Sequence, residues 1–236
     1  MRRMVESALF GVVLVLGGGI AIPSSALAKA PPPQADYRFN LNLKSSVNKA
    51  NAPTMKEIGG GFSYYFTSIG GQRDNYLNWV SGSGLKLPQA QKVIGTPGDY
   101  TIAMLANFDE VDTYRKIVDF DNDQADEGWY VHDSYLDPFD VDDVSGPASP
   151  PITGGAWHML VMTRAGGRVK AYVDNVRYLN LPDPTGEEVL GPQRVLRFLR
   201  DNGLGSEETG GKIARLRIWK NPLTDKQAKN LKPLFN

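Results

Sequence analysis

The chain has 236 residues, no cysteine, and 26 basic against 26 acidic residues, so its formal net charge is zero. This composition is typical of a globular domain, and balanced charge without a basic run argues against a nucleic-acid partner. The absence of cysteine excludes disulfides, a thiolate zinc site and a cysteine nucleophile. With only two histidines, a three-histidine metal site is excluded as well.

The first 28 residues differ from the rest and predict a secretory signal peptide. Arg2 and Arg3 form a short basic start, an apolar run covers 8–22, and Ala26-Leu27-Ala28 supplies the small residues of a cleavage site. The apolar run is shorter than the about 20 residues that a spanning helix needs. The alternative is an uncleaved N-terminal anchor, against which the clean cleavage signal argues.

This pattern divides the chain into three parts. We expect a signal peptide at 1–28, a proline-rich linker at 29–36 that contains three consecutive prolines, and one domain at 37–236. Since no second long apolar segment follows, we expect no membrane span in the mature form. The protein is therefore expected to be secreted, either into a periplasm or out of the cell.

Hydrophobic residues in the domain recur mostly with period two, which predicts strands. The expected strands cover 37–43, 62–66, 76–80, 100–108, 116–120, 129–132, 157–164, 169–174, 195–199 and 212–219. Tight turns are predicted at Gly166-Gly167 and Asp174-Asn175, which gives two hairpins. Many short strands with glycine and proline turns indicate a sandwich or a barrel.

Two stretches depart from this pattern. Arg194, Arg197 and Arg200 recur with a spacing of three, which fits a helix as well as a strand, so periodicity leaves 195–199 undecided. Near the C-terminus, Thr224 and Gln227 have the spacing of a capping box, which predicts one short helix.

Four blocks, in sequence order, carry a family resemblance. They are Tyr100-Thr-Ile-Ala-Met-Leu-Ala, Tyr114 to Phe120 followed by Gly128-Trp-Tyr-Val131, Trp157-His158 to Arg164 with Val169 to Asn175, and Gly211 to Trp219 with Asn221-Pro-Leu-Thr-Asp. Together they resemble laminin-G-like domains of the concanavalin A-like lectin/glucanase superfamily over about residues 60 to 231. The resemblance implies an all-β fold, a two-sheet antiparallel jelly-roll sandwich with one short C-terminal helix. It also makes 195–199 a strand.

The motif residues are expected to serve the scaffold. Trp157 alternates with Met159 and Val161, which predicts that it fills the core between the sheets, and His158 then points to the other face. Neither histidine has a partner in the sequence that would make it catalytic. The aromatic residues are also expected in the core or on a sheet face, although a row of them could stack sugars; they are Tyr64, Tyr65, Phe66, Tyr76 and Trp79.

Glycoside hydrolases share this fold, and their signature is E-x-D-x-x-E, because the reaction needs paired carboxylates. Glu110 and Asp112 match its first two acids, but Arg115 stands where the last glutamate should be. We therefore expect no catalytic residues and no enzyme activity.

Oxygen-rich loops follow two of the predicted strands and indicate a calcium site, since Ca²⁺ takes six to eight oxygen ligands. Related domains show a similar pattern in the second loop. The expected ligands are Asp119, Asp121, Asn122, Asp201, Asn202 and Glu207. The alternative is two ordinary solvated acidic loops, which is also how we interpret a third, at 137–143.

These observations predict a secreted, non-catalytic binding module that recognises a carbohydrate or an extracellular protein partner, with possible dependence on Ca²⁺ as a cofactor. The alternatives are a carbohydrate-active enzyme of the same fold, and a purely adhesive or structural surface protein. A lectin would need exposed aromatic groups beside a cation, and an enzyme would need two facing carboxylates in a cleft.

The signal-peptide prediction has a direct test. Because Ala26 and Ala28 place small residues at both positions of the cleavage site, the mature protein is expected to begin at Lys29. N-terminal sequencing of exported protein measures this, and exported material that still begins with Met1 would contradict it.

Overall fold

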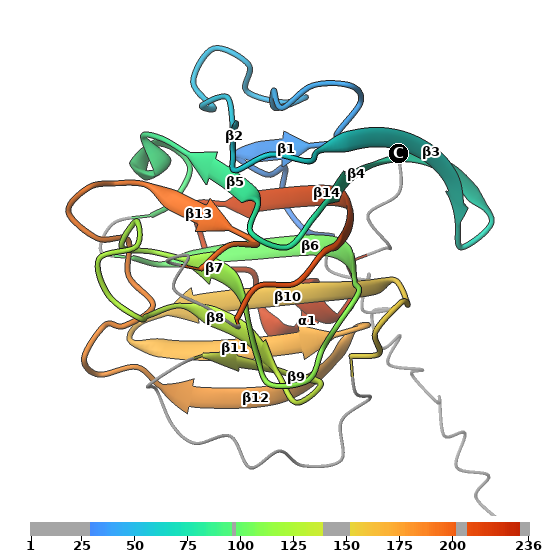
Figure 1. The fold of residues 1–236 in the computed structure, drawn as a ribbon. Coiled ribbons are helices and arrows are strands. Elements are labelled where there is room, and N and C mark those ends of the chain that lie inside the picture. Colours follow the sequence, from blue (N-terminus) through green and yellow to red (C-terminus); the bar gives the residue numbers. More distant parts are fainter. Residues whose placement is uncertain (1–28, 96–97, 139–151, 202–206, 232–236) are drawn as a thin grey trace, which may run out of the picture.

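Two antiparallel sheets stack face to face in the computed structural model (Figure 1), which describes residues 29–95, 98–138, 152–201 and 207–231. The larger sheet has eight strands and the smaller has six. This confirms the all-β sandwich that the family resemblance implies. Among the described residues, no helix combines the length and apolar character needed to cross a membrane. The predicted signal peptide lies outside the described residues.

The strand order of each sheet interleaves distant parts of the chain. Along the larger sheet the order is β12 (Val176–Pro182), β11 (Arg168–Val173), β10 (His158–Ala165), β6 (Tyr100–Phe108), β14 (Gly211–Trp219), β4 (Gln72–Trp79) and β3 (Ser63–Ile69), while β1 (Ala35–Tyr37) also pairs with β14. The smaller sheet runs β2 (Lys56–Ile58), β5 (Gly84–Leu87), β13 (Leu196–Phe198), β7 (Tyr114–Asp119), β8 (Trp129–His132) and β9 (Tyr135–Pro138). A 3₁₀ turn (Ala90–Lys92) and α1 (Asp225–Lys229) complete the described elements.

Local chemistry sets several of these boundaries as predicted. The β10–β11 hairpin turns at Gly166-Gly167 and the β11–β12 hairpin at Asp174-Asn175, and all four residues have positive φ, as tight hairpin turns require. Thr224 and Gln227 form the predicted capping box at the start of α1. The stretch around Leu196 is a strand, β13, so the resemblance resolves what periodicity leaves open.

The central strands of the larger sheet, β10, β6 and β14, are buried on both faces. The sheet's inner face forms the main core with the smaller sheet, where Trp129 and Phe198 have no exposed surface. Its outer face carries a second apolar cluster, in which Leu105, Val161 and Tyr172 pack with Ala228 of α1. Burial on both faces explains why β6 is buried at every position rather than alternating.

This second cluster corrects the position of Trp157. The alternation of Trp157 with Met159 and Val161 is as predicted, but these residues face the outer cluster under α1, not the core between the sheets. Trp157 is only partly buried there. The neighbouring Leu160 and Met162 face the main core, because residues two apart share one face of a strand.

The N-terminal segment departs from prediction in two ways. The expected linker 29–36 packs onto the domain, since the Trp219 indole donates to the Pro31 carbonyl at 2.7 Å and β1 pairs with β14. The expected strand 37–43 ends at Tyr37, because Phe39 and Leu41 have positive φ, which a strand does not allow. The chain instead forms a long loop at 38–54.

A buried ion pair fastens β1 to β14. The Asp36 carboxylate accepts two hydrogen bonds from the Arg215 guanidinium, at 2.5 and 2.6 Å, and both side chains are almost completely buried. Arg217 and Arg38 lie 3.4 and 3.5 Å from the same carboxylate. Burial by itself raises the pKa of Asp36, but the hydrogen bond and charge of Arg215, with the charges of Arg217 and Arg38, lower it overall.

Asp36→Asn should therefore destabilise the protein at neutral pH by about 3–5 kcal/mol, because it removes the carboxylate that faces the buried Arg215 charge. A lowered folded-state pKa means that the contribution of Asp36 is present above its unfolded-state pKa and disappears as the pH falls through the folded-state value. Urea unfolding at pH 7 and at pH 3 measures the loss, which should shrink at the lower pH. Glu57→Gln, at an exposed position on β2, is the control; equal stability of wild type and Asp36→Asn at pH 7 would contradict the expectation.

Candidate functional site

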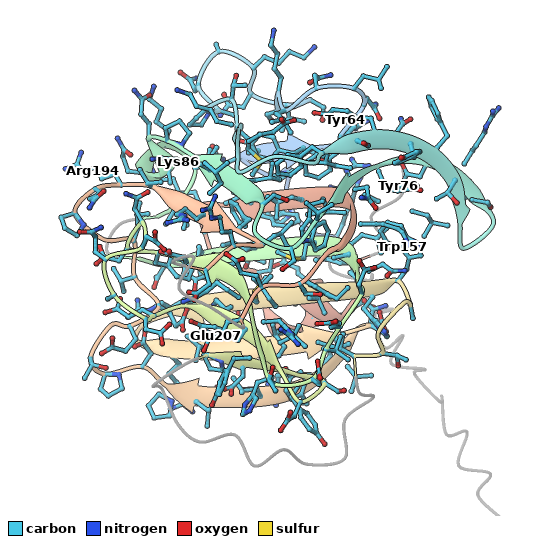
Figure 2. All side chains as sticks on the ribbon, in the orientation of Figure 1. Tyr64, Tyr76, Lys86, Trp157, Arg194 and Glu207 are labelled. Carbon is cyan, nitrogen blue, oxygen red and sulfur yellow. The ribbon has the colours of Figure 1, made fainter. Side chains whose placement is uncertain are left out.

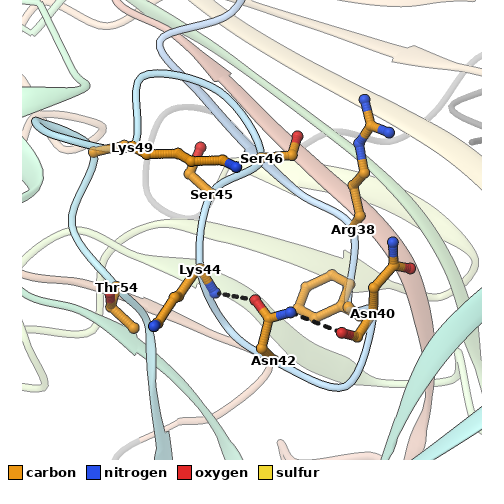
Figure 3. A pocket seen from close by; sticks show the side chains of 10 residues that line it. Arg38, Asn40, Asn42, Lys44, Ser45, Ser46, Lys49 and Thr54 are labelled. Atoms are coloured by element: carbon orange, nitrogen blue, oxygen red, sulfur yellow. Dashed lines mark hydrogen bonds between the residues drawn. The ribbon is translucent and has the colours of Figure 1, made fainter.

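The loop at 38–54 lines an open cavity of about 570 Å³ (Figure 3). Its walls come from one stretch of chain, and most of its lining side chains are polar or basic. The lining residues are Arg38, Phe39, Asn40, Asn42, Lys44, Ser45, Ser46, Lys49, Ala52 and Thr54. Amides and hydroxyls both donate and accept hydrogen bonds, so the cavity offers a dense set of polar contacts to a small hydroxylated molecule.

The loop holds its shape through its own polar groups. The Asn42 amide donates to the Asn40 carbonyl at 2.7 Å and accepts from the Lys44 N–H at 2.9 Å (Figure 3). The Ser45 hydroxyl accepts from the Asp36 N–H at 3.0 Å and donates to the Val47 carbonyl at 2.6 Å. Such local bonds replace a sheet ladder, and they fix the cavity before any ligand arrives.

Backbone strain accompanies this cavity. Phe39, Leu41 and Asn48 adopt positive φ, a conformation that is uncommon for residues other than glycine and is concentrated at functional sites. Sequence analysis missed the site because Tyr37, Phe39 and Leu41 alternate like a strand. The available signal was the density of Asn and Ser at 40–48, residues that favour turns over strands.

The six predicted calcium ligands do not come together as one set. Asp201 and Glu207 lie with Asp126, and these three offer carboxylate oxygens within 4.8 Å of one another. The Asp119 carboxylate instead accepts from the backbone N–H groups of Asp121 and Asp123, both at 2.8 Å, so it shapes its own turn.

The remaining predicted ligands lie elsewhere. The Asn122 amide donates to Gln193, and Asn202 lies outside the described residues. Asp121 belongs to a second group of carboxylates, where Glu127 and Glu187 share a hydrogen bond. Burial, the Glu187 contact and the charge of Asp121 together raise the pKa of Glu127 to about 7. The acidic residues of the 119–127 loop therefore belong to two clusters: Asp126 lies with Asp201 and Glu207, and Asp121 lies with Glu127 and Glu187.

A lysine occupies the first cluster. Lys116 Nζ lies 3.2 Å from Asp126 Oδ1 and 3.6 Å from Asp201 Oδ1. It also donates to the Glu127 carbonyl at 2.9 Å and sits 4.2 Å from the centre of the Tyr130 ring. The ammonium, almost completely buried, supplies a positive charge where the sequence predicts a metal ion. The oxygen donors suit calcium, but the lysine must leave before they can hold it.

The glucanase-like residues are also neutralised by a basic side chain. Arg115 Nη2 lies 3.0 Å from Glu110 and 2.8 Å from Asp112, and its hydrogen bond and charge lower the pKa of Asp112. Both carboxylates are mostly exposed, in the segment between β6 and β7. An arginine therefore binds the two acids where a hydrolase would hold a third carboxylate.

His158 has a structural role. Its Nε2 accepts from the Thr153 N–H at 2.9 Å, so its Nδ1 carries the proton and donates to Asp174 at 2.8 Å. Asp174 also accepts from the Met159 N–H. Both ring nitrogens are thus engaged in fixing the hairpin turn, and neither is available as a general base.

The candidate sugar-stacking aromatics are split between faces, since neighbours along β3 and β4 point to opposite sides. Trp79 is buried in the main core, whereas Tyr65 stacks on Tyr76 with ring centres 5.5 Å apart, on the outer face. Tyr76 meets the edge of Trp157 at 5.9 Å (Figure 2). Phe66 is 66% exposed but lies on the face opposite Tyr65. They do not form a single row.

Comparison with known proteins identifies the fold. The laminin G model described as the concanavalin A-like lectin/glucanases superfamily matches residues 80–229. No curated protein sequence matches the chain. Among solved structures, domain 4 of AbnA, a GH43 extracellular arabinanase from Geobacillus stearothermophilus in complex with arabinotriose, is 19% identical with a TM-score of 0.62. The match covers 84% of this chain and 97% of that domain.

Botulinum neurotoxin binding domains are also similar in fold. The serotype G binding domain is 11% identical with a TM-score of 0.58, and the match covers 85% of this chain but 50% of that one. A type C neurotoxin structure, described as dependent on two ganglioside molecules for cell entry, is 13% identical with a TM-score of 0.57, covering 84% and 49%. The chain therefore spans about half of these neurotoxin chains.

Proposed function

The chain belongs to the concanavalin A-like lectin/glucanase superfamily, and we propose that it is a secreted, non-catalytic module that binds a glycan. The observation that carries this proposal is the polar cavity of about 570 Å³ inside the loop at 38–54. This volume falls within the range of small-molecule sites, about 300–1,000 Å³. Export follows from the predicted signal peptide at 1–28, with cleavage after Ala28.

The cavity has the chemistry that a sugar needs. Asn40, Asn42 and Thr54 are exposed, and their amides and hydroxyl can each donate to and accept from sugar hydroxyls. Since the loop is already ordered by its internal hydrogen bonds, binding does not require the chain to lose further conformational freedom. The whole-domain likeness to an arabinanase domain crystallised with arabinotriose supports the same ligand class.

The two alternatives have less support. A hydrolase of this fold needs two facing carboxylates, and Arg115 ties together the pair that matches the signature. An adhesive role with an extracellular protein partner would be favoured by a large apolar patch. The exposed large apolar side chains are Leu41, Tyr65, Phe66, Val80 and Val176. Of these, Tyr65 and Phe66 lie next to each other on β3 and therefore point to opposite faces.

Filling the cavity should abolish glycan binding. Thr54 lines it and is exposed, so Thr54→Trp occupies the space with little cost to the fold. A glycan array with the mature protein identifies ligands, and titration calorimetry on the best neutral or acidic ligand measures affinity in the variant.

The matched control is Gln124→Trp, which adds the same ring at an exposed position in the 121–127 loop. It should bind like the wild type. Unchanged affinity of Thr54→Trp, or no glycan bound by the wild type, would contradict the proposal.

We also propose that the cluster of Asp126, Asp201 and Glu207 is where calcium would bind, because these carboxylates lie within 4.8 Å of one another. Lys116 competes for this place with its own charge. Burial raises the pKa of Glu207, and the neighbouring charges of Asp201 and Asp126 raise it further.

Removing the competing ammonium should expose the calcium site. In Lys116→Met the carboxylates repel one another, and millimolar Ca²⁺ should raise its melting temperature by several degrees over chelator, since a ligand at a hundredfold excess over Kd stabilises by about 2.7 kcal/mol. The wild type should respond less, and Mg²⁺ should do less than Ca²⁺ because it demands octahedral geometry.

Adding Asp201→Asn to Lys116→Met should remove the calcium response and serves as the site control. If Lys116→Met melts identically in Ca²⁺ and in chelator, these acids hold no calcium and the ammonium is their only cation.

A further inference from the structure

The cavity at 38–54 is lined by positive charge without negative charge. Arg38, Lys44 and Lys49 contribute three cationic side chains, and none of the other lining residues is acidic. Figure 3 shows the three cationic side chains on different sides of the cavity. At the carboxylate cluster, by comparison, the Lys116 ammonium faces Asp126 and Asp201. The cavity is therefore cationic on a protein of zero net charge.

The nearest carboxylate cannot neutralise it. Asp36 is shared among Arg215, Arg217 and Arg38, with both of its shortest contacts, 2.5 and 2.6 Å, going to Arg215. One negative charge therefore faces three guanidinium groups. The contact with Arg38 is the longest, at 3.5 Å, so Arg38 retains most of its capacity to bind an anion that enters the cavity.

Further groups at the cavity are unused. The Ser46 hydroxyl is buried and forms no hydrogen bond with any residue that the structure describes. Lys44 and Lys49 are exposed, and within the described chain neither forms an ion pair. A ligand with anionic oxygens would give both exposed ammonium groups a partner of opposite charge.

We propose that the cavity selects an acidic sugar, whose carboxylate or sulfate group is bound by Arg38, Lys44 and Lys49 while its hydroxyls contact the surrounding amides. The inference rests on the proposed glycan-binding function and names the class of glycan. Arginine binds planar oxyanions through paired N–H groups, and exposed lysines add charge that attracts the ligand over a longer range.

The test uses ligands that differ only in charge. Binding of trigalacturonate is compared with that of its methyl ester, and binding of sialyllactose with that of its methyl ester, by titration calorimetry on the mature protein. A sulfated heparin disaccharide forms a separate arm, which distinguishes a sulfate from a carboxylate as the preferred anion. At least one acidic probe should bind about tenfold more tightly than its neutral partner, as expected for hydrogen bonds to charged groups. For the sulfated arm, the chemically desulfated disaccharide is the partner.

Paired variants connect the selectivity to the cavity. Lys44→Gln with Lys49→Gln should weaken the acidic probe about tenfold more than the neutral partner, so that the ratio of the two affinities falls towards one. The control, Lys226→Gln with Lys229→Gln, removes the same charge from exposed positions on α1 and should change neither affinity. Because both cavity lysines are exposed, their replacement should leave the melting temperature unchanged.

The outcomes separate this inference from the function it rests on. If neutral and acidic partners bind equally, the selectivity is wrong while glycan binding stands. If the control pair weakens acidic binding as much as the cavity pair, general charge attraction is responsible and the inference is overturned. If neither the probes nor an array of neutral glycans binds, both the inference and the proposed function fail.

Discussion

The cavity in the loop at 38–54 depends on the buried ion pair of Asp36 with Arg215. The two short hydrogen bonds of this pair join β1 to β14, in the middle of the larger sheet. Once β1 is held, the chain must return from Tyr37 to β2 through the loop at 38–54, and that loop forms the cavity. Because a buried charge must be paired, Asp36 also draws Arg217 and Arg38 towards its carboxylate, and Arg38 is one of the residues that line the cavity.

Basic side chains decide the chemistry at three separate places. Arg115 joins the two acids that a hydrolase of this fold would need free, and Lys116 enters the carboxylate cluster where the sequence predicts calcium. In the cavity, by contrast, Arg38, Lys44 and Lys49 have no carboxylate among the lining residues. Basic side chains thus contact exposed or clustered carboxylates at two of these places, whereas at the cavity they have no acidic neighbour among the lining residues.

The second apolar cluster helps to make the larger sheet a firm base for the loop at 38–54. With α1 covering its outer face, the larger sheet buries its central strands β6, β10 and β14 on both sides, and these strands form a fixed platform. The loop at 38–54 is anchored to this platform by β1 and closed by the Met55 N–H bond to Leu43. In many folds the binding residues lie on loops that a rigid scaffold holds in position.

The sequence by itself determined the features that depend on neighbouring residues. The hairpin turns at Gly166-Gly167 and Asp174-Asn175, the capping box at Thr224 and the limits of β6 and β8 all follow from local backbone preferences and alternation. The tertiary structure alone decided which face each alternating set covers, as Trp157 shows, because both faces of the larger sheet are apolar. It also decided that the alternating 37–43 segment becomes a loop, and that Lys116 joins Asp126 and Asp201. Ion pairs and cavities form between residues far apart in the chain, and sequence spacing does not encode those distances.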